Sequence, residues 1–200
     1  MRYRTVSFYD LISLEHKVGK NNIKRILSDF SCPLNSDVEK FMHEKAYDFE
    51  RIGLSRTYLV YAQLNAHESY LVGFYSLGQS HVEVDKKLSK SLRKRIFGTS
   101  YPIGKNIKTI LIGQLSKNYA NGYNKYITGD ILLSLAFSRI NEIHKILPSV
   151  VTHIDCKDEP KIKRFYERHG FQLLRKTDND MLIYLAPTSQ IIKNVQEVES

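Results

Sequence analysis

The sequence predicts an α/β protein with a mixed sheet and helices on both of its faces. Two runs rich in β-branched and aromatic residues, Thr57–Asn65 and Ser69–Gly78, are separated by the short polar segment AHE and are typical of an antiparallel pair. A nearly continuous apolar run, Thr109–Ser116, is typical of a strand buried on both faces. A long helical pattern follows it, and parallel pairing is expected only where a helix crosses between two strands.

Helices are predicted before the strand pair and after the buried run. A short helix is expected around Asn22–Asp29, and SDVE at Ser36–Glu39 has the form of a capping box that opens a second helix. The longest helix is predicted from Thr128 to the residues before Pro148, because proline cannot continue a helix. Its apolar stripe comprises Ile131, Leu132, Leu135, Ala136, Ile140 and Ile143.

The C-terminal third of the sequence predicts a strand, a short helix and two further strands. The first strand is expected at Ser149–Asp155, and the helix begins near Pro160, a residue that suits a first helical turn. Apolar residues of this helix share one face at the spacing i, i+3 and i+4, and Gly170 ends it. These residues are Ile162, Phe165 and Tyr166. FQLLRK and MLIYLA, on either side of a turn at Asp178–Asp180, are the last two strands.

The length of the chain, 200 residues, fits one well-buried domain. We expect this domain to span residues 1–186 and a polar C-terminal tail to span residues 187–200. No run of about 18 uncharged apolar residues occurs. Arg2, Arg4 and Asp10 lie where an apolar signal segment would be. The sequence therefore predicts a cytoplasmic protein without a membrane partner.

The two cysteines, Cys32 and Cys156, lie far apart and show no C-x-x-C or Cys/His ligand spacing. Neither a disulfide framework nor a zinc site is indicated by this pattern. We therefore expect two buried thiols and no metal ion.

The formal net charge of +9 favours polyanionic partners. Much of it is local, because the segment Lys86–Arg95 has six basic residues in ten. Leu88, Leu92 and Ile96 lie at the spacing i, i+4 and i+8, which predicts a short basic amphipathic helix. This helix is either a solvated face that keeps the protein soluble or a contact for RNA phosphates.

The segment Asn118–Leu133 joins the buried run to the start of the longest helix. Gly122 and Gly129 allow the backbone to turn tightly and allow a ligand to approach the amides. Unpaired amides and the positive end of the helix dipole are suited to bind phosphate oxygens there. Glycine and asparagine are equally common in loops that only turn the chain, so the loop by itself leaves both alternatives open.

The segment RFYERHGFQLL resembles the closing motif of the GNAT acyltransferase superfamily, with Phe165, Tyr166, Gly170 and Phe171 at the family spacing. TILIGQLS is similar to the family's central fourth strand, and NKYITGDILL occupies the place of its pyrophosphate-binding loop. FSCPLNSDVEKFMHEKAYDFERIGLSRTYLV is similar to the corresponding region of toxin-type acetyltransferases. The resemblance covers most of the chain. It implies a GNAT-like α/β (α+β) fold, with a mixed, mostly antiparallel central sheet of six to seven strands and helices on both faces.

The resemblance implies acetyl-CoA as the acyl donor. Amides of the fourth strand would bind its pantetheine arm and polarise the thioester carbonyl, and the loop would hold its pyrophosphate. The residues implied for acetyl-CoA binding are Leu115, Ser116, Lys117, Asn124, Lys125, Tyr126, Ile127, Thr128, Gly129, Asp130 and Glu159. The family loop is commonly Q/R-x-x-G-x-G/A, and an alignment on Gly129 puts Asn124 at the Q/R position and Ile127 at the first glycine. Glu159 stands where the family often has an asparagine.

The same resemblance implies Tyr166 as the general acid. A phenol has a reference pKa of about 10, so it carries a proton that it can donate to a departing thiolate, whose thiol has a pKa of about 8.5. Without the motif, a tyrosine on an amphipathic helix is usually a core residue with its hydroxyl at the rim. A general base is not identified. The residues considered for that role, all unproven, are His153, Glu68, Glu83 and Asp155.

The predicted function is that of an acetyl-CoA-dependent N-acetyltransferase that acts on a primary amine. The acceptor is open, and aminoacyl-tRNA is one option because of the positive charge and the toxin-like region. The alternative is a nucleic-acid-binding module that has kept the fold and lost catalysis. Stabilisation by acetyl-CoA would favour the enzyme, and salt-dependent RNA binding without CoA binding would favour the module. The oligomeric state is open, with a homodimer as one option.

Overall fold

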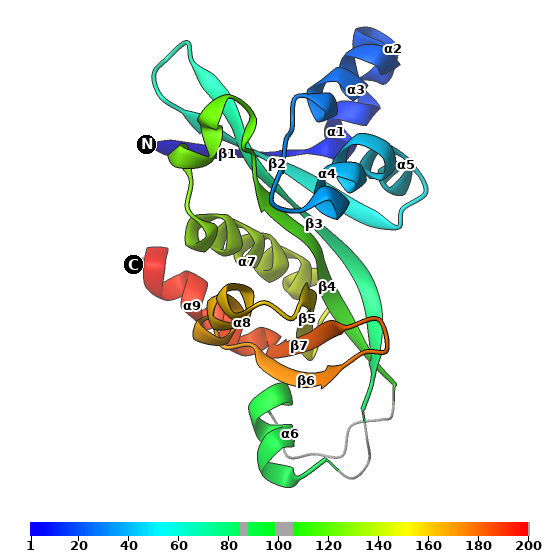
Figure 1. Ribbon diagram of the computed structural model, residues 1–200, viewed down its shortest axis with the longest axis vertical. Coiled ribbons are helices and arrows are strands. Elements are labelled where there is room, and N and C mark those ends of the chain that lie inside the picture. Colours follow the sequence, from blue (N-terminus) through cyan, green and yellow to red (C-terminus); the bar gives the residue numbers. More distant parts are fainter. Residues whose placement is uncertain (85–87, 99–105, 200) are drawn as a thin grey trace. The chain divides into compact units, whose positions relative to one another are not determined.

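The computed structural model describes residues 1–84, 88–98 and 106–199. The described residues form the strands β1 (Arg2–Ser7), β2 (Ser55–Gln63), β3 (Ser69–Glu83), β4 (Asn106–Lys117), β5 (Val151–Lys157), β6 (Gln172–Lys176) and β7 (Met181–Pro187). Within this part of the chain they make one seven-stranded sheet in the order β1-β2-β3-β4-β5-β7-β6 (Figure 1). The ladders β1–β2, β2–β3, β5–β7 and β6–β7 are antiparallel, and β4–β5 is parallel. The expected mixed, mostly antiparallel sheet is confirmed.

The chain divides into two compact units, which we call the first unit (residues 1–78 and 113–136) and the second unit (residues 79–112 and 137–200). Helices of the first unit are α1 (Phe8–Ser13), α2 (Glu15–Val18), α3 (Lys20–Ser28), α4 (Ser36–Lys40), the π-helix η1 (Phe41–Lys45), α5 (Ala46–Arg51) and the 3-10 helix η2 (Ala120–Tyr126). Helices of the second unit are α6 (Lys90–Phe97), α8 (Pro160–Arg168) and α9 (Thr188–Glu199). Helix α7 (Gly129–Ile146) contributes residues to both. The single domain expected over residues 1–186 stays a prediction.

Aromatic rings form much of the core of the first unit. Phe30 and Phe74 meet edge to face with ring centroids 4.9 Å apart, and Phe41 stacks on Phe74 at 6.1 Å. Helix α3 adds Ile23 and Leu27, which lie four positions apart on one helical face and are both fully buried. This apolar face packs α3 into the core, where the sequence predicted a short helix.

The predicted capping box at Ser36–Glu39 is wrong. The N-cap of α4 is Asn35, whose backbone is extended and whose Oδ1 accepts a hydrogen bond from the Asp37 amide at 3.1 Å. Glu39 instead accepts a hydrogen bond from the Cys32 amide at 2.5 Å. That hydrogen bond holds the pKa of Glu39 below its usual value. Glu39 therefore fastens the segment before α4.

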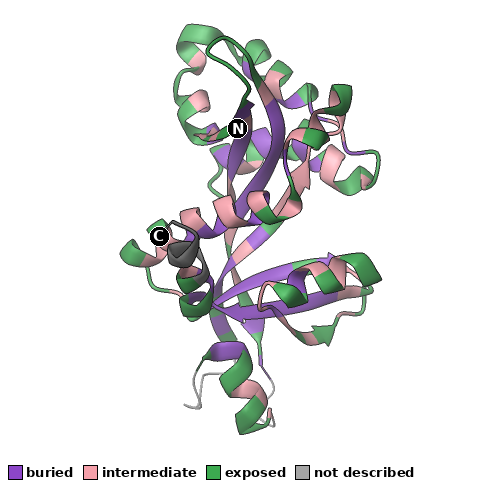
Figure 2. Cartoon of the chain, turned by 90° about the vertical axis from the view of Figure 1, so that its left-hand side faces the viewer, coloured by how far each residue is buried: buried purple, intermediate pink, exposed green. Residues whose placement is uncertain are grey.

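The core of the second unit is mainly aliphatic. Val151 of β5, Leu185 of β7 and Ile96 of α6 are completely buried and belong to one cluster. Figure 2 shows strands β5 and β7 of this unit largely buried, whereas α8 presents much of its surface to solvent. The alternation of buried and exposed residues along α8 is that of an amphipathic helix.

The basic helix begins later than the sequence predicted. Helix α6 starts at Lys90, because the Oγ of Ser89 accepts a hydrogen bond from the Leu92 amide at 3.2 Å and so caps it. Gly98, in the left-handed conformation, ends the helix. Lys86 and Lys87, the first two residues of the predicted helix, lie outside the described residues.

Two elements at the ends of the chain were not predicted. Strand β1 pairs with β2 from Arg2↔Gln63 to Ser7↔Tyr58, and as an edge strand it tolerates its exposed arginines. The residues expected to form a polar tail contain α9, whose Ile191 is fully buried. Helix α9 contacts β5 and β7.

None of the helices formed by residues 1–84, 88–98 and 106–199 combines the length and apolar character needed to cross a membrane. Over the same residues, no group of three or more His, Cys, Asp and Glu side chains is arranged to hold a metal ion.

We predict that Ile191→Ala lowers the free energy of unfolding by about 2–5 kcal/mol, the usual cost of a cavity left by a buried aliphatic side chain. Urea denaturation followed by circular dichroism measures it. The matched control is Lys193→Ala on the same helix, where the residue is exposed and a change within about 0.5 kcal/mol is expected. Equal effects of the two substitutions would contradict the packing of α9.

Candidate active site

Strands β3 and β4 approach each other closely at Gly73. A Cβ atom placed on Gly73 would lie 2.8 Å from the carbonyl oxygen of Ser116 and 3.4 Å from the Cα of Lys117. Real Cβ atoms essentially never come that near to a backbone oxygen. Glycine at this position therefore lets β3 hold the backbone of Leu115–Lys117, the segment implied to bind pantetheine.

Asn118, immediately after β4, ties this segment to the rest of the first unit. It is fully buried, its Nδ2 donates to the Leu71 carbonyl at 2.9 Å, and its Oδ1 accepts from the amides of Ser31 and Ala120 at 2.9 and 3.0 Å. Its own amide donates to the Val72 carbonyl at 2.8 Å. The sequence analysis did not single out Asn118, although a polar residue that ends a buried strand is a usable signal for such a clamp.

The loop from β4 to α7 is anchored by tyrosines. Tyr123 of η2 stacks on Tyr70 of β3 with ring centroids 4.8 Å apart, and Tyr126 lies 6.3 Å from Tyr70. The hydroxyl of Tyr3 in β1 donates to the Tyr126 carbonyl at 2.8 Å. Asn121 and Gly122 both have positive φ angles, which turn the chain back toward α7. These contacts fix the loop before its last residues enter the helix.

The start of α7 is formed by residues of the predicted pyrophosphate loop. Thr128 accepts a hydrogen bond from the Ile131 amide at 3.2 Å through its Oγ1, so its hydroxyl acts as a helix cap. Ile127 is buried and Gly129 begins the helix, whose first amides have no acceptor within it. Such amides suit a pyrophosphate, whereas the Asp130 carboxylate in the first turn opposes a negative ligand.

The side chains of Asn124 and Lys125 precede this helix start. Asn124 is half-buried, and Lys125 is exposed with its Nζ 5.0 Å from the centroid of the Tyr126 ring. Leu115–Lys117 and Asn124–Asp130 thus both belong to the first unit, on β4, η2 and the start of α7. Their acetyl-CoA binding stays a prediction, which depends on backbone donors more than on side chains.

Tyr166 and Glu159 belong to the second unit, where Tyr166 lies on α8 and Glu159 immediately precedes that helix. The Tyr166 side chain is largely buried and packs edge to face against Phe165 and Phe171, with centroids 5.1 and 5.8 Å apart. Among the described residues, none makes a hydrogen bond with the Tyr166 hydroxyl. Burial raises the pKa of Tyr166, and the neighbouring Cys156 raises it further.

The surroundings of Tyr166 keep its proton in place at neutral pH. Burial raises the pKa of the Cys156 thiol to about 11, and nearby Asp155 and Asp158 act in the same direction. A phenol in such a site is a weak acid, so it can protonate a thiolate only if the same desolvation also raises the basicity of that thiolate. The Tyr166 hydroxyl therefore stays protonated at neutral pH. Cys156 was predicted to be a buried thiol but not to be a neighbour of Tyr166.

The residues considered as general bases have other partners. The two ring nitrogens of His153 lie 2.8 Å from Asp155 Oδ1 and 3.5 Å from Thr109 Oγ1, and the side chain is buried on β5. Glu68 accepts a hydrogen bond from Asn65 in the exposed turn between β2 and β3. Glu159 precedes α8 and is exposed, and its side chain does not cap the helix. The base therefore stays unassigned.

The protein is similar to known proteins in its three-dimensional structure and not detectably in its sequence. No family model matches the sequence, and no curated protein is significantly similar to it. Solved structures do match: a tyrosine-to-phenylalanine mutant of KacT is 16% identical over 99% of both chains with a TM-score of 0.65. AtaT complexed with acetyl-methionyl-tRNAfMet is 17% identical over 100% of both chains with a TM-score of 0.64.

A crystal structure of a bacterial toxin is 18% identical, with 85% of this chain and 87% of that chain covered and a TM-score of 0.65. The chain has the GNAT fold. The GNAT fold was expected from the F-Y-x-x-x-G-F motif. In this fold the residues implied for acetyl-CoA binding lie on β4, on η2, between η2 and α7, and at the start of α7, except Glu159, which precedes α8, and the motif tyrosine lies on α8.

We predict that Gly73→Ala lowers the free energy of unfolding by about 1–3 kcal/mol, the usual cost of overpacking, because its Cβ must displace the Ser116 carbonyl. Urea denaturation measures the change. Gly78→Ala on the same strand is the control, since its Cβ would lie 3.2 Å from the Leu54 carbonyl and needs a smaller shift. A Gly73→Ala protein as stable as the parent would show that β4 is not held in the way described.

Proposed function

We propose that the protein is an acetyl-CoA-dependent N-acetyltransferase that acts on a primary amine. The observation that carries the proposal is Tyr166: its ring is buried in α8, its hydroxyl makes no hydrogen bond with any described residue, and it stands at the motif spacing. A phenol held among aromatic rings keeps its proton at neutral pH and can donate it to a departing thiolate. The solved structure of AtaTR bound with AcCoA, which is 20% identical to this chain, supports the choice of acyl donor.

The proposed chemistry assigns one role to each part. Backbone amides of Leu115–Lys117 bind the pantetheine arm and stabilise the negative charge that develops on the thioester oxygen. The amides at the start of α7 receive the pyrophosphate. The amine nitrogen forms a bond to the acetyl carbon as the carbon–sulfur bond breaks, and Tyr166 gives its proton to the departing thiolate. The proton released by the amine returns to Tyr166 through solvent, so the enzyme is regenerated.

Aminoacyl-tRNA is the acceptor that we propose. AtaT, one of the structural neighbours, was solved with acetyl-methionyl-tRNAfMet. The net charge of +9 favours a polyanionic substrate. An α-amino group has a pKa of about 7.7–8.0, against about 10.4 for lysine, so a sizeable fraction of it is already neutral at physiological pH. Such an amine needs no strong general base, and two residues considered for that role, His153 and Asp155, are engaged with each other. We place the activity in the cytoplasm, where both substrates are available.

The first test offers labelled acetyl-CoA and the protein three acceptors in parallel: aminoacylated tRNA, deacylated tRNA and a cell extract freed of tRNA. We expect label only with aminoacylated tRNA, and mild alkali should then release an N-acetylated amino acid. Label that appears only in the extract would contradict aminoacyl-tRNA as the acceptor but would still support acetyltransferase activity. Salt-dependent RNA binding without any labelled product or CoA binding would favour a binding module instead.

The second test replaces Tyr166 by phenylalanine. We expect single-turnover acetyl transfer to fall by about 10²–10⁴-fold, the usual contribution of a general acid, with acetyl-CoA affinity near that of the parent by calorimetry. Tyr184→Phe is the matched control, because it also removes a tyrosine hydroxyl from this unit. That hydroxyl donates to Glu167 at 2.8 Å, so its loss should reduce stability more than rate. Unchanged turnover in Tyr166→Phe would remove Tyr166 from the chemistry.

A further inference from the structure

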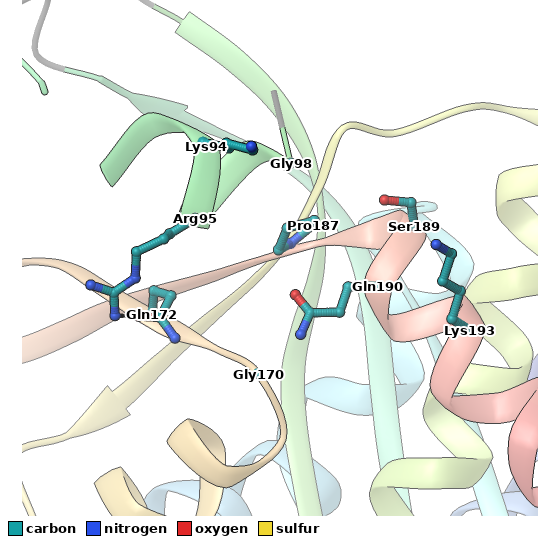
Figure 3. Close-up of a pocket in the computed structure, with 9 residues that line it drawn as sticks. All are labelled: Lys94, Arg95, Gly98, Gly170, Gln172, Pro187, Ser189, Gln190 and Lys193. Carbon is teal, nitrogen blue, oxygen red and sulfur yellow. Dashed lines mark hydrogen bonds between the residues drawn. The ribbon is translucent and has the colours of Figure 1, made fainter. Parts of the chain in front are cut away.

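A cavity of about 390 Å³ lies in the second unit (Figure 3). The polar residues that line it are Lys94, Arg95, Gln172, Ser189, Gln190 and Lys193. They come from α6, β6 and α9, which are far apart in sequence. Figure 3 shows Gln190 and Lys193 projecting from α9 and Arg95 extending from α6 toward Gln172. The volume is within the range of about 300–1,000 Å³ that holds small ligands.

The cavity concentrates positive charge that none of the described carboxylates neutralises. No acidic residue occurs among the described residues that line it. Within the described chain, no carboxylate forms an ion pair with Lys94, Arg95 or Lys193. Other lysines of the same unit do find such partners, since Lys163 and Lys176 lie 3.1 and 3.6 Å from Asp158. Like charges held together without a counter-ion favour the binding of an anion.

Two glycines keep the cavity open. Gly98 and Gly170 have φ angles of +70° and +90°, so a side chain at either position would be strained. A Cβ on Gly170 would lie 3.0 Å from the Nε2 of Gln190, and one on Gly98 would lie 3.4 Å from Pro187. A side chain on Gly170 would crowd the Gln190 amide, whereas one on Gly98 would make an ordinary contact with Pro187.

The donors suit a phosphate group. Arg95 donates through Nη2 to the Oε1 of Gln172 at 2.5 Å, which orients the guanidinium and leaves the Gln172 amide nitrogen as a further donor. Two lysines, a serine hydroxyl and the Gln190 amide add hydrogen-bond donors on other walls of the cavity. A tetrahedral phosphate oxyanion can accept from such a set, whereas a planar carboxylate has only two oxygens to offer.

We propose that this cavity binds a phosphate of an RNA strand and thereby docks the RNA on α6. The choice of RNA rests on the proposed function. It is supported by α6 itself, where Lys90 is exposed and lies one turn before Lys94. Four residues of helix advance about 6 Å, which is of the order of the distance between successive phosphates along one strand. A strand with one phosphate in the cavity can therefore continue along the helix, which a free phosphate ion cannot do.

The test measures binding of a fluorescent 12-nucleotide oligouridylate by anisotropy over a series of salt concentrations. In Lys94→Gln/Lys193→Gln, we expect the affinity at 0.1 M salt to fall more than about tenfold and the slope of log K against log salt to decrease by about 0.7 for each lost contact. Lys108→Gln/Lys145→Gln is the matched control: the net charge changes equally, both lysines are exposed, and Lys145 lies in the last turn of a helix as Lys94 does. Equal behaviour of the two double variants would overturn the proposal.

Ser189→Glu separates binding from folding. A carboxylate in the first turn of α9 stabilises the helix, so the melting temperature should be unchanged or higher, while the negative charge repels a phosphate and RNA affinity should fall. Inorganic phosphate and poly-glutamate serve as competitors. Displacement of RNA by phosphate, and not by poly-glutamate at equal charge, is expected. Equal displacement by poly-glutamate would show that the cavity recognises charge alone and would overturn the phosphate assignment.

These results are independent of acetyl transfer. If pocket variants lose RNA but keep their stabilisation by acetyl-CoA, both proposals stand. If the parent protein binds RNA through the cavity and transfers no acetyl group, the proposed function fails and the cavity stands. If acetyl transfer to aminoacyl-tRNA occurs and the pocket variants bind RNA as the control variants do, the cavity proposal alone fails.

Discussion

The close approach of two backbones at Gly73 is the constraint on which the first half of the candidate site depends. With no Cβ at this position, β3 lies against the carbonyl of Ser116 closely enough to exclude any other residue. Asn118 then fastens the end of β4 with four hydrogen bonds between 2.8 and 3.0 Å. A strand held from one side in this way can present its backbone to a ligand without losing its shape.

Desolvation is the corresponding constraint in the second unit. The Tyr166 ring lies among Phe165 and Phe171, and the raised pKa values of Tyr166 and Cys156 have burial as their main cause. A site that opposes charge keeps a phenol protonated and makes a thiolate more basic, so the two partners of the proposed proton transfer are matched by the same surroundings. A charged acid would not be needed there.

Among the described residues, the basic side chains that form ion pairs are not those that line the cavity. Lys163 and Lys176 neutralise Asp158, and Arg56 neutralises the buried Glu50 at 2.8 Å. Lys94, Arg95 and Lys193 gather instead around a cavity without an acidic wall. Charge of the first kind maintains the fold and is satisfied within it, whereas charge of the second kind is available to a partner.

Local patterns in the sequence determined the strands β2 to β5, the helices α7 and α8, and the motif around Tyr166, because periodicity and turn residues act over a few positions. They placed the cap of α4 wrongly and did not predict β1 or α9, whose formation depends on distant partners such as β2 for β1 and β5 for α9. Only the tertiary structure could decide that Gly73 supports Ser116, that Cys156 adjoins Tyr166, and that α6, β6 and α9 enclose one cavity. Each of these contacts joins residues that are far apart in the chain. Such contacts leave no local pattern in a single sequence, so they could not be predicted from it.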